Sequence, residues 1–433
     1  MPNARAGRGG RIANGVPARR ARTPPRAVQL VACLAALQAA GCGGDAAPHR
    51  PEGSAAGPRD SAGVPVRIAR DEGWPPGAAW RLERDLVVGE IDGPLAFGRI
   101  ADVAPRAAGG LWVVDAQAAR VRGFDGAGRE ALSIGGPGRG PGEFRSPAGL
   151  VETDDGRVAV FESYPPRLDW FDADGRYLGA ARVAPGRDEA GTRTVPAFAQ
   201  WAVAPDGTPF ADVFAVPVPG GDPEVRHALL RFPGDGLGGE GPDTVHSWRV
   251  PAPLPDPAGG IPVLPPRPLW AVGPDGAVRW TPGTPYEIRT LTREGGLAAV
   301  LRRPIPSTRL TPALRAALEA GIRRSLEAGG GPGAADAILR RLEFPEALPH
   351  VAGLWVSRPD GTLYVARYTE ESVREERPTS LDVLGPDGEF LGELPLPEGF
   401  SPRAFTPEAA YGVLEDELEV PFAARFRIVR PDE

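Results

Sequence analysis

The chain has 433 residues, 42% of them hydrophobic and 24% charged, so it can bury a large core and is not an intrinsically disordered protein. Its net charge is −7, which argues against nucleic acid as a partner, because binding to phosphates relies on an excess of basic side chains. Only Cys33 and Cys42 are present, which excludes a disulfide-rich scaffold.

Residues 1–41 have the features of a secretory signal. They carry seven Arg and no acidic residue, and they end in the apolar run "AVQLVACLAALQAAGC", which is shorter than the roughly 20 residues that a permanent membrane helix needs. The sequence Ala39-Ala40-Gly41-Cys42 resembles the lipobox of bacterial lipoproteins, which implies that Cys42 is lipidated and becomes the new N-terminus. An ordinary signal peptide, in which Cys42 is incidental, is the alternative. We therefore predict an extracytoplasmic protein held on a bacterial membrane by its N-terminal lipid, at the periplasmic or outer face of the outer membrane.

Residues 42–65 form the predicted tether. The stretch "GGDAAPHRPEGSAAGPRDSAGVP" has almost no large apolar residues, as expected for a flexible linker between the lipid and a folded body. Removal of the signal would leave 42 Arg against 56 acidic residues, a charge of −14. This balance strengthens the prediction of no nucleic-acid partner.

From residue 66 onward, short apolar runs alternate with tight turns built on Gly, a pattern that predicts many short strands joined as hairpins. The turns come in pairs, and each pair predicts a unit of four strands. The first turn of each unit contains Gly109, Gly156, Gly207, Gly276 or Gly361. The second contains Gly128, Gly175, Gly236, Gly295 or Gly388.

An incomplete sixth unit follows the five complete ones. Residues 409–431 supply a hairpin with its turn near Asp416 and Glu417 and then a third strand, while residues 84–92 form a strand with no unit of its own. Pairing the two chain ends would close a ring and protect its open sheet edges. We therefore predict an all-β fold over residues 66–433, a six-bladed β-propeller closed by its N- and C-terminal strands. A ring of five or seven blades is the structural alternative.

The stretch "GPGRGPGEFRSPAGLVETDDGRVAVFESYPPRLDWFDADGRYL", residues 136–178, resembles an NHL-type repeat. The whole body is similar to the six-bladed β-propeller proteins that occur among bacterial lipoproteins. Its Gly-rich start is not a phosphate-binding loop, because a strand rather than a helix follows it and no Lys accompanies it. We expect it to join the first blade to the second, with Phe144 and Pro147 packing it down.

One segment, residues 311–344, has a helical pattern instead. Residues 311–329 place Leu314, Leu318, Ile322 and Leu326 on one face, and residues 334–344 form a second short helix after a Gly-rich break. These helices are predicted to be an insertion between blades four and five. The insertion is either a packed decoration of one face or a lid over the central channel.

Two sets of residues are candidates for a binding face. Units one and two share an acidic residue and an Arg on either side of one loop, Asp115 with Arg120 and Glu162 with Arg167, and Arg367 takes the acidic position in unit five. These pairs either brace the loop or, with Tyr164, line a site at the central mouth. At one register position of the innermost strands, the residues are Trp201, Trp270 and Trp355. These rings either pack between blades or form a surface for stacking a ligand.

The common enzymatic sites of six-bladed propellers are difficult to build from this sequence. Asn occurs only in the signal, at Asn3 and Asn14, and the His residues are too widely spaced for an evident zinc site. We predict no cofactor and no metal, and the enzyme question stays open. The sequence favours a binding or scaffold module for a protein, peptide or glycan. The alternative is a hydrolase or lyase that uses channel carboxylates such as Asp115 and Glu162 as base or metal ligands.

Overall fold

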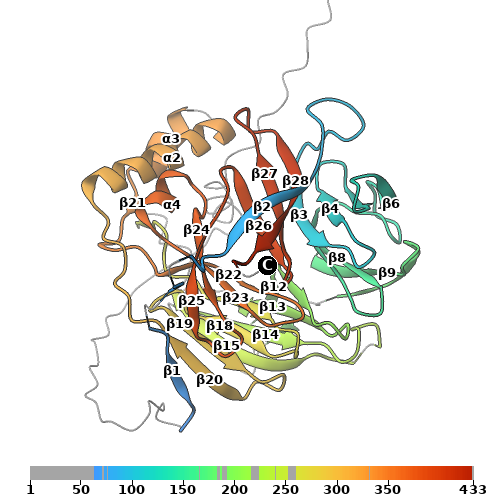
Figure 1. Cartoon of the computed structure of the whole chain (residues 1–433), viewed down its shortest axis with the longest axis horizontal. Coiled ribbons are helices and arrows are strands. Elements are labelled where there is room, and N and C mark those ends of the chain that lie inside the picture. Colours follow the sequence, from blue (N-terminus) through green and yellow to red (C-terminus); the bar gives the residue numbers. More distant parts are fainter. Residues whose placement is uncertain are drawn as a thin grey trace, which may run out of the picture.

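The computed structural model describes residues 63–70, 73–75, 77–164, 166–182, 186–187, 193–215, 224–238, 240–251, 260–330 and 332–431. Six sheets, each with four antiparallel strands, are arranged as the blades of a ring (Figure 1). The innermost strands of neighbouring blades contact one another all the way around. The prediction of an all-β, six-bladed propeller is confirmed.

The first three blades follow one another along the chain. Blade 1 contains β3 (Ile100–Pro105), β4 (Leu111–Asp115), β5 (Arg120–Phe124) and β6 (Glu130–Ile134). Blade 2 contains β7 (Pro147–Glu152), β8 (Val158–Ser163), β9 (Pro166–Phe171) and β10 (Tyr177–Ala181). Blade 3 contains β12 (Arg193–Val203), β13 (Pro209–Ala215), β14 (Glu224–Arg231) and β15 (Asp243–Pro251), with the short β11 (Gly186–Arg187) beside β12.

The remaining blades include both chain ends. Blade 4 contains β17 (Leu269–Val272), β18 (Val278–Thr281), β19 (Glu287–Leu291) and β20 (Leu297–Arg302), with β1 (Val66–Ile68) added outside β20. Blade 5 contains β22 (Val351–Val356), β23 (Leu363–Arg367), β24 (Ser380–Leu384) and β25 (Phe390–Pro395). Blade 6 contains β26 (Phe400–Phe405), β27 (Ala409–Glu415), β28 (Pro421–Val429) and β2 (Arg81–Val88).

The predicted turn pattern is confirmed in every complete blade. All ten turn glycines have φ between 74° and 93°, a left-handed conformation that a residue with a Cβ adopts only at a cost. The Gly-rich stretch after β6 leads into β7, and the Phe144 ring is fully buried in the cluster between blades 1 and 2. The stretch is therefore a connection between blades, as expected.

Apolar side chains on both faces of each sheet form the core. Each of the six junctions between neighbouring blades encloses its own cluster of buried apolar side chains. At the junction of blades 1 and 6, Leu86 and Val88 of β2 pack against β3, β4 and β27. The N-terminal strand is thus part of the core as well as of the sheet.

Closure of the ring is confirmed, with two corrections to strand assignment. Strand β2 pairs antiparallel with β28 from Arg81↔Val429 to Val88↔Ala423, so it starts and ends before the predicted 84–92. Residues 409–431 contain two strands rather than three, because the innermost strand of blade 6 is β26, at residues 400–405. Proline and small residues in β26 hide the alternation by which a strand is recognised.

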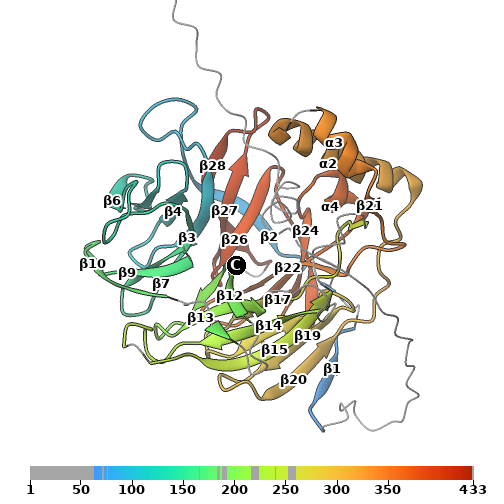
Figure 2. The ribbon, with the colours of Figure 1, turned by 180° about the vertical axis from the view of Figure 1, so that it is seen from behind.

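A segment that we call the strap, described over residues 63–70, 73–75 and 77–88, crosses the outer edges of three blades. Strand β1 pairs in parallel with β20 of blade 4. Gly73 and Trp74 then lie against Gly392 and Glu393 of blade 5. The strap ends as β2 in blade 6 (Figures 1 and 2). It therefore links the outer edges of three consecutive blades.

The helical insertion lies between β20 and β22, as predicted. It contains α2 (Pro312–Gly330) and α3 (Pro332–Leu339), and it packs through Leu314 beside α4 (Glu370–Arg374) at the rim (Figure 2). The second helix ends before the predicted residue 344, because β21 (Leu342–Glu343) pairs in parallel with β16 (Ile261–Pro262). In the described part of the chain, no helix has the length and apolar character needed to cross a membrane.

Candidate functional site

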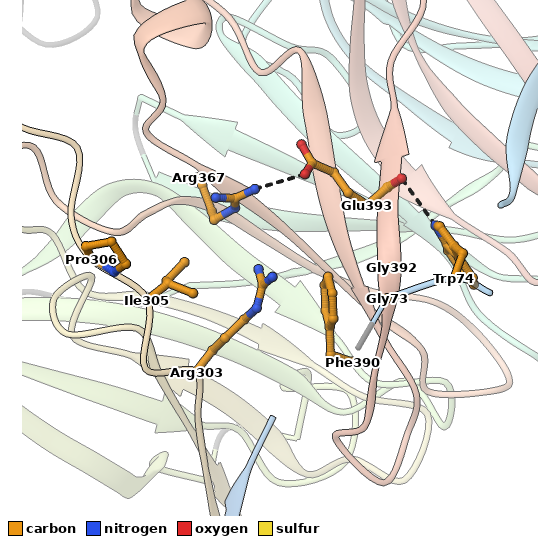
Figure 3. Close-up of a pocket in the computed structure, with 9 residues that line it drawn as sticks. All are labelled: Gly73, Trp74, Arg303, Ile305, Pro306, Arg367, Phe390, Gly392 and Glu393. Carbon is orange, nitrogen blue, oxygen red and sulfur yellow. Dashed lines mark hydrogen bonds and ion pairs between the residues drawn. The ribbon is translucent and has the colours of Figure 1, made fainter. Parts of the chain in front are cut away.

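A pocket of about 460 Å³ opens at the outer rim between blades 4 and 5, beneath the strap. Its lining comes from three places: the strap, the segment after β20, and strands β23 and β25 of blade 5 (Figure 3). The lining residues are Gly73, Trp74, Arg303, Ile305, Pro306, Arg367, Phe390, Gly392 and Glu393. The pocket thus combines aromatic and aliphatic surface with two Arg and one Glu.

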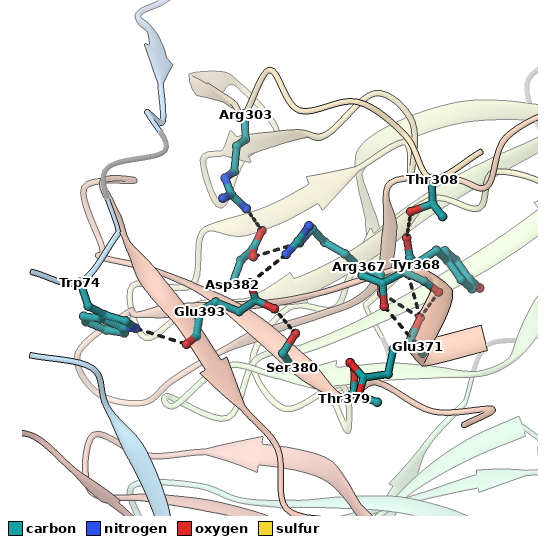
Figure 4. Close-up of polar contacts among 12 residues, drawn as sticks. Trp74, Arg303, Thr308, Arg367, Tyr368, Glu371, Thr379, Ser380, Asp382 and Glu393 are labelled. Carbon is teal, nitrogen blue, oxygen red and sulfur yellow. Dashed lines mark hydrogen bonds and ion pairs between the residues drawn. The ribbon is translucent and has the colours of Figure 1, made fainter. Parts of the chain in front are cut away.

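Beneath the pocket, Asp382 of β24 ties the two Arg together. One oxygen of its fully buried carboxylate accepts a hydrogen bond from Nη1 of Arg303, and the other accepts one from Nε of Arg367 at 3.0 Å (Figure 4). Burial raises the pKa of Asp382, and the two guanidinium groups oppose that rise. A buried carboxylate with two cationic partners is a fixed part of the structure, because removing either partner leaves charge uncompensated.

Glu393 holds the other side of Arg367 in a much more exposed setting. Its Oε2 lies 3.2 Å from Nη2 of Arg367, and its side chain is 48% exposed against 24% for the Arg. Ser380 donates a hydrogen bond to its other oxygen. Exposed ion pairs are worth about 0–1 kcal/mol, so solvent or a ligand carboxylate can replace Glu393 at little cost. Arg367 therefore has one permanent partner and one exchangeable partner.

Aromatic rings shape the pocket around these charges. The Arg303 guanidinium lies over the Phe390 ring, 3.7 Å from its centroid. On the opposite side, Nε1 of Trp74 donates a hydrogen bond of 3.3 Å to the Glu393 carbonyl oxygen, which holds the strap against β25. Phe390 thus packs on the Arg303 guanidinium, and the two rings supply an apolar wall.

The helical insertion is anchored close to the same Arg. Thr308 Oγ1 donates a hydrogen bond of 2.8 Å to the Tyr368 carbonyl, one residue after Arg367 (Figure 4). Thr369 then caps α4 through a reciprocal pair of hydrogen bonds with Ser372. The insertion thus packs against the rim near the pocket, which favours a packed decoration over a lid on the channel.

In blade 2, the predicted residues Glu162 and Arg167 come together in a buried network. Glu162 Oε1 accepts hydrogen bonds from the backbone N–H of Arg145 and Ser146 at 2.5 and 2.9 Å, and Oε2 lies 2.9 Å from Nη2 of Arg167. Arg167 Nε also donates to Asp169 at 2.8 Å. The network braces the entry to blade 2, so this pair holds the loop in place, as the first of the two alternatives for it expected. Backbone donors and Arg167 engage the carboxylate, so it is not placed as a free base.

The matching pair in blade 1 does not form an ion pair among the described residues. Asp115 accepts a hydrogen bond of 3.0 Å from the Ala118 N–H, inside the loop that follows β4, while Arg120 is exposed. The short loop satisfies the carboxylate locally, so the bracing predicted from the spacing is confirmed only in blade 2.

Asp169 and Asp382 occupy the same register in their blades. Asp169 pairs with Val160, and Asp382 pairs with Val365. Each of these two Val lies four positions after the first turn glycine of its blade. Burial raises the pKa of Asp169 to about 6, and its Oδ1 has no hydrogen-bond partner in the described part of the chain. In blade 5, Arg367 stands at the position that an acidic residue has in blades 1 and 2. It contacts the buried Asp382 carboxylate on one side and the exposed Glu393 carboxylate on the other.

The three predicted Trp do not share a surface. Trp201 stacks on Phe232 with centroids 5.6 Å apart, Trp270 is buried between blades 3 and 4, and Trp355 meets Phe405 edge-on at 6.1 Å. Each therefore packs at a junction between blades. Tyr164 is 60% exposed and lies beside Arg145.

Of the predicted candidates, only Arg367 lines the pocket. Cys42 lies outside the described residues. Sequence reasoning missed Trp74, Arg303, Asp382 and Glu393; the shared register of Asp169 and Asp382 is the one signal that could have identified any of them. Among the residues that the structure describes, no cluster of three His, Cys, Asp or Glu could hold a metal ion.

Replacing Asp169 by Asn should change how stability depends on pH. The pKa of Asp169 is about 6 in the folded chain and 3.8 as a free group, so its protonation stabilises the fold fully below about pH 4. This contribution is lost as pH rises through about 6. We expect the free energy of unfolding of the wild type, relative to Asp169→Asn, to fall by at most about 3 kcal/mol between pH 4 and 7. Urea unfolding across this range measures it, and a difference that does not vary with pH would contradict the assignment.

No protein-family model matches the sequence, and no curated protein is significantly similar to it. Among solved structures, a DUF4221 family member from Bacteroides vulgatus has a TM-score of 0.47 at 12% identity, with coverage of 82% of this chain and 99% of its own. Virginiamycin B lyase from Staphylococcus aureus has a TM-score of 0.41 at 13% identity, covering 81% and 100%. The calcium-binding protein regucalcin from Agrobacterium tumefaciens has a TM-score of 0.38 at 12% identity, covering 84% and 96%. The assignment of six blades rests on the strand pairing described above.

Proposed function

We propose that this chain is an extracytoplasmic, lipid-anchored propeller with NHL-type blades, and that it acts as a binding or scaffold module. Among a protein, a peptide and a glycan, the pocket between blades 4 and 5 best fits a peptide segment of a partner protein. The observation that carries this proposal is the exchangeable ion pair between Arg367 and Glu393 beside an apolar wall.

Recognition in this pocket would rest on replacement of one carboxylate by another. A carboxylate from the ligand can take the place of Glu393 on Arg367, while Asp382 continues to hold the buried side of the same guanidinium. An apolar group next to that carboxylate would pack on Trp74 and Phe390. Acidic residues flanked by apolar ones present this combination in an extended peptide.

The position of the strap connects this pocket to the proposed anchor. The described chain enters the body at β1, on the outer edge of blade 4, and Trp74 in the same strap lines the pocket. The tether from Cys42 to Val66 would have an average span of about 25–30 Å as a flexible chain. A lipid on Cys42 would therefore keep the pocket close to the membrane surface, where it can meet membrane-bound partners.

Cys42→Ser tests the anchor. Each buried lipid methylene contributes about 0.8 kcal/mol, so a multi-chain anchor should hold the wild type in the membrane fraction. We expect the variant to move to the soluble fraction after cell lysis, measured by immunoblotting of both fractions. Retention of Cys42→Ser in the membrane at the wild-type level would rule out anchoring through this residue.

Arg367→Gln tests the pocket. With the photo-crosslinking residue p-benzoylphenylalanine at Pro306, the wild-type background should capture a partner protein in the native membrane. Loss of a charge-assisted contact, worth about 1.5–3 kcal/mol, should lower the yield of that product at least 10-fold in Arg367→Gln.

The matched control is Arg374→Gln, which removes an exposed ion pair with Glu370 on nearby α4. This variant should give the wild-type yield, and thermal unfolding of each purified variant checks that the fold is retained. Equal yields from Arg367→Gln and the wild type would exclude the pocket as the binding site.

A further inference from the structure

Blade 3 carries an imidazole and a carboxylate in direct contact, away from the pocket described above. Nδ1 of His227 on β14 lies 3.1 and 3.2 Å from the two carboxylate oxygens of Asp212 on β13. The Asp212 side chain is 5% exposed and the His227 side chain is 20% exposed. Among the described residues, His227 is the one hydrogen-bond partner of this buried carboxylate.

Aromatic rings fix the plane of this imidazole. Phe214, His227 and Trp248 are direct neighbours across β13, β14 and β15. The His227 ring stacks between the other two, with centroids 5.7 Å from Phe214 and 5.4 Å from Trp248 and interplanar angles of 30° and 17°. Cross-strand ring pairs of this kind stabilise a sheet, and here they also prevent the imidazole from turning away from Asp212.

The contact with Asp212 determines which nitrogen carries the proton. Burial raises the pKa of Asp212, and the contact with His227 opposes that rise. When ionised, this carboxylate only accepts hydrogen bonds, so Nδ1 is the donor and the neutral imidazole has its lone pair on Nε2. No hydrogen bond to Nε2 is present within the part of the chain that the structure describes. An imidazole with an orienting carboxylate on one nitrogen and a lone pair on the other is arranged to accept a proton.

We propose that His227 is a catalytic base, positioned by Asp212, for the hydrolysis of a carboxylic ester by water. Nε2 takes a proton from water as the water oxygen bonds to the ester carbonyl carbon. The tetrahedral intermediate then breaks its bond to the alcohol oxygen, and the alcohol leaves with the proton that Nε2 returns. Water is the co-reactant, and the imidazole ends the cycle in its starting form.

The size of the effect that one base can supply favours esters over amides. A positioned general base contributes about 10²–10⁴-fold in rate. This is adequate for an ester whose alcohol or phenol is a good leaving group, and it is inadequate for an amide, whose leaving group is a much stronger base. The inference goes beyond the proposed binding function and uses a different blade, so either can fail alone.

The test uses p-nitrophenyl acetate with the full chain, and release of p-nitrophenol is followed by its absorbance. We expect His227→Gln to lower kcat/KM about 100-fold or more. Release of p-nitrophenol should then be no faster than in the absence of protein. Asp212→Asn should lower kcat at least 10-fold with KM nearly unchanged, because Asp212 acts through His227 and does not touch the ester. In His227→Ala, added imidazole should restore part of the lost rate.

His246→Gln is the matched control. His246 also lies against Trp248, with ring centroids 5.8 Å apart, but it has no carboxylate hydrogen bond among the described residues. It should keep the wild-type rate. A wild-type rate no higher than that of His227→Gln would overturn the proposal, as would an equal loss in His246→Gln. If Asp212→Asn lowers the rate but added imidazole does not rescue His227→Ala, the pair has a structural role only, and the proposal is contradicted. Thermal unfolding separates any of these losses from misfolding.

Discussion

Every blade of this propeller depends on how the ring is closed. The outer edge of an open sheet exposes unpaired backbone N–H and C=O groups, and an incomplete ring would leave the core between its first and last blades exposed to water. Strand β2 covers the edge of β28 by pairing with it along its length, and it buries Leu86 and Val88 between blades 1 and 6. Since the chain has no internal disulfide framework, this noncovalent closure is what holds its two ends together.

The same strap gives the candidate pocket its shape. Before it reaches blade 6, the strap pairs with blade 4 through β1 and places Trp74 against the edge of blade 5. The strap therefore supplies one wall of the pocket, and the cationic wall is held from below by Asp382. Closure, proposed attachment and proposed binding all involve one short stretch of chain.

The fold could be read from the sequence because its signals are local. Turn glycines such as Gly156 must adopt a left-handed conformation, and their spacing repeats from blade to blade. The pairing of the chain ends followed from the cost of an unpaired edge. Strand β26 was missed because Pro402 and small side chains interrupt its alternation, and β1 is too short to recognise.

The candidate sites were harder to predict because their residues meet only in three dimensions. Arg367 was identified by its register, yet its partner Asp382 lies on another strand, and Arg303, which binds the same carboxylate, follows blade 4. Asp212 and His227 are on adjacent strands joined by a long connection, so their spacing in sequence says nothing about their contact. Trp270 and Trp355 share a register but lie in different clusters. Trp270 packs between blades 3 and 4, and Trp355 packs between blades 5 and 6.

Hydrogen exchange of the backbone amides, resolved by mass spectrometry, tests the closure most directly. Because β2 is the outermost strand of blade 6 and pairs on one side only, the account predicts that its amides facing β28, about half of them, exchange as slowly as those of β27 and β28. Rapid exchange of β2 alongside protected β27 and β28 would show that the N-terminal strand does not close the ring.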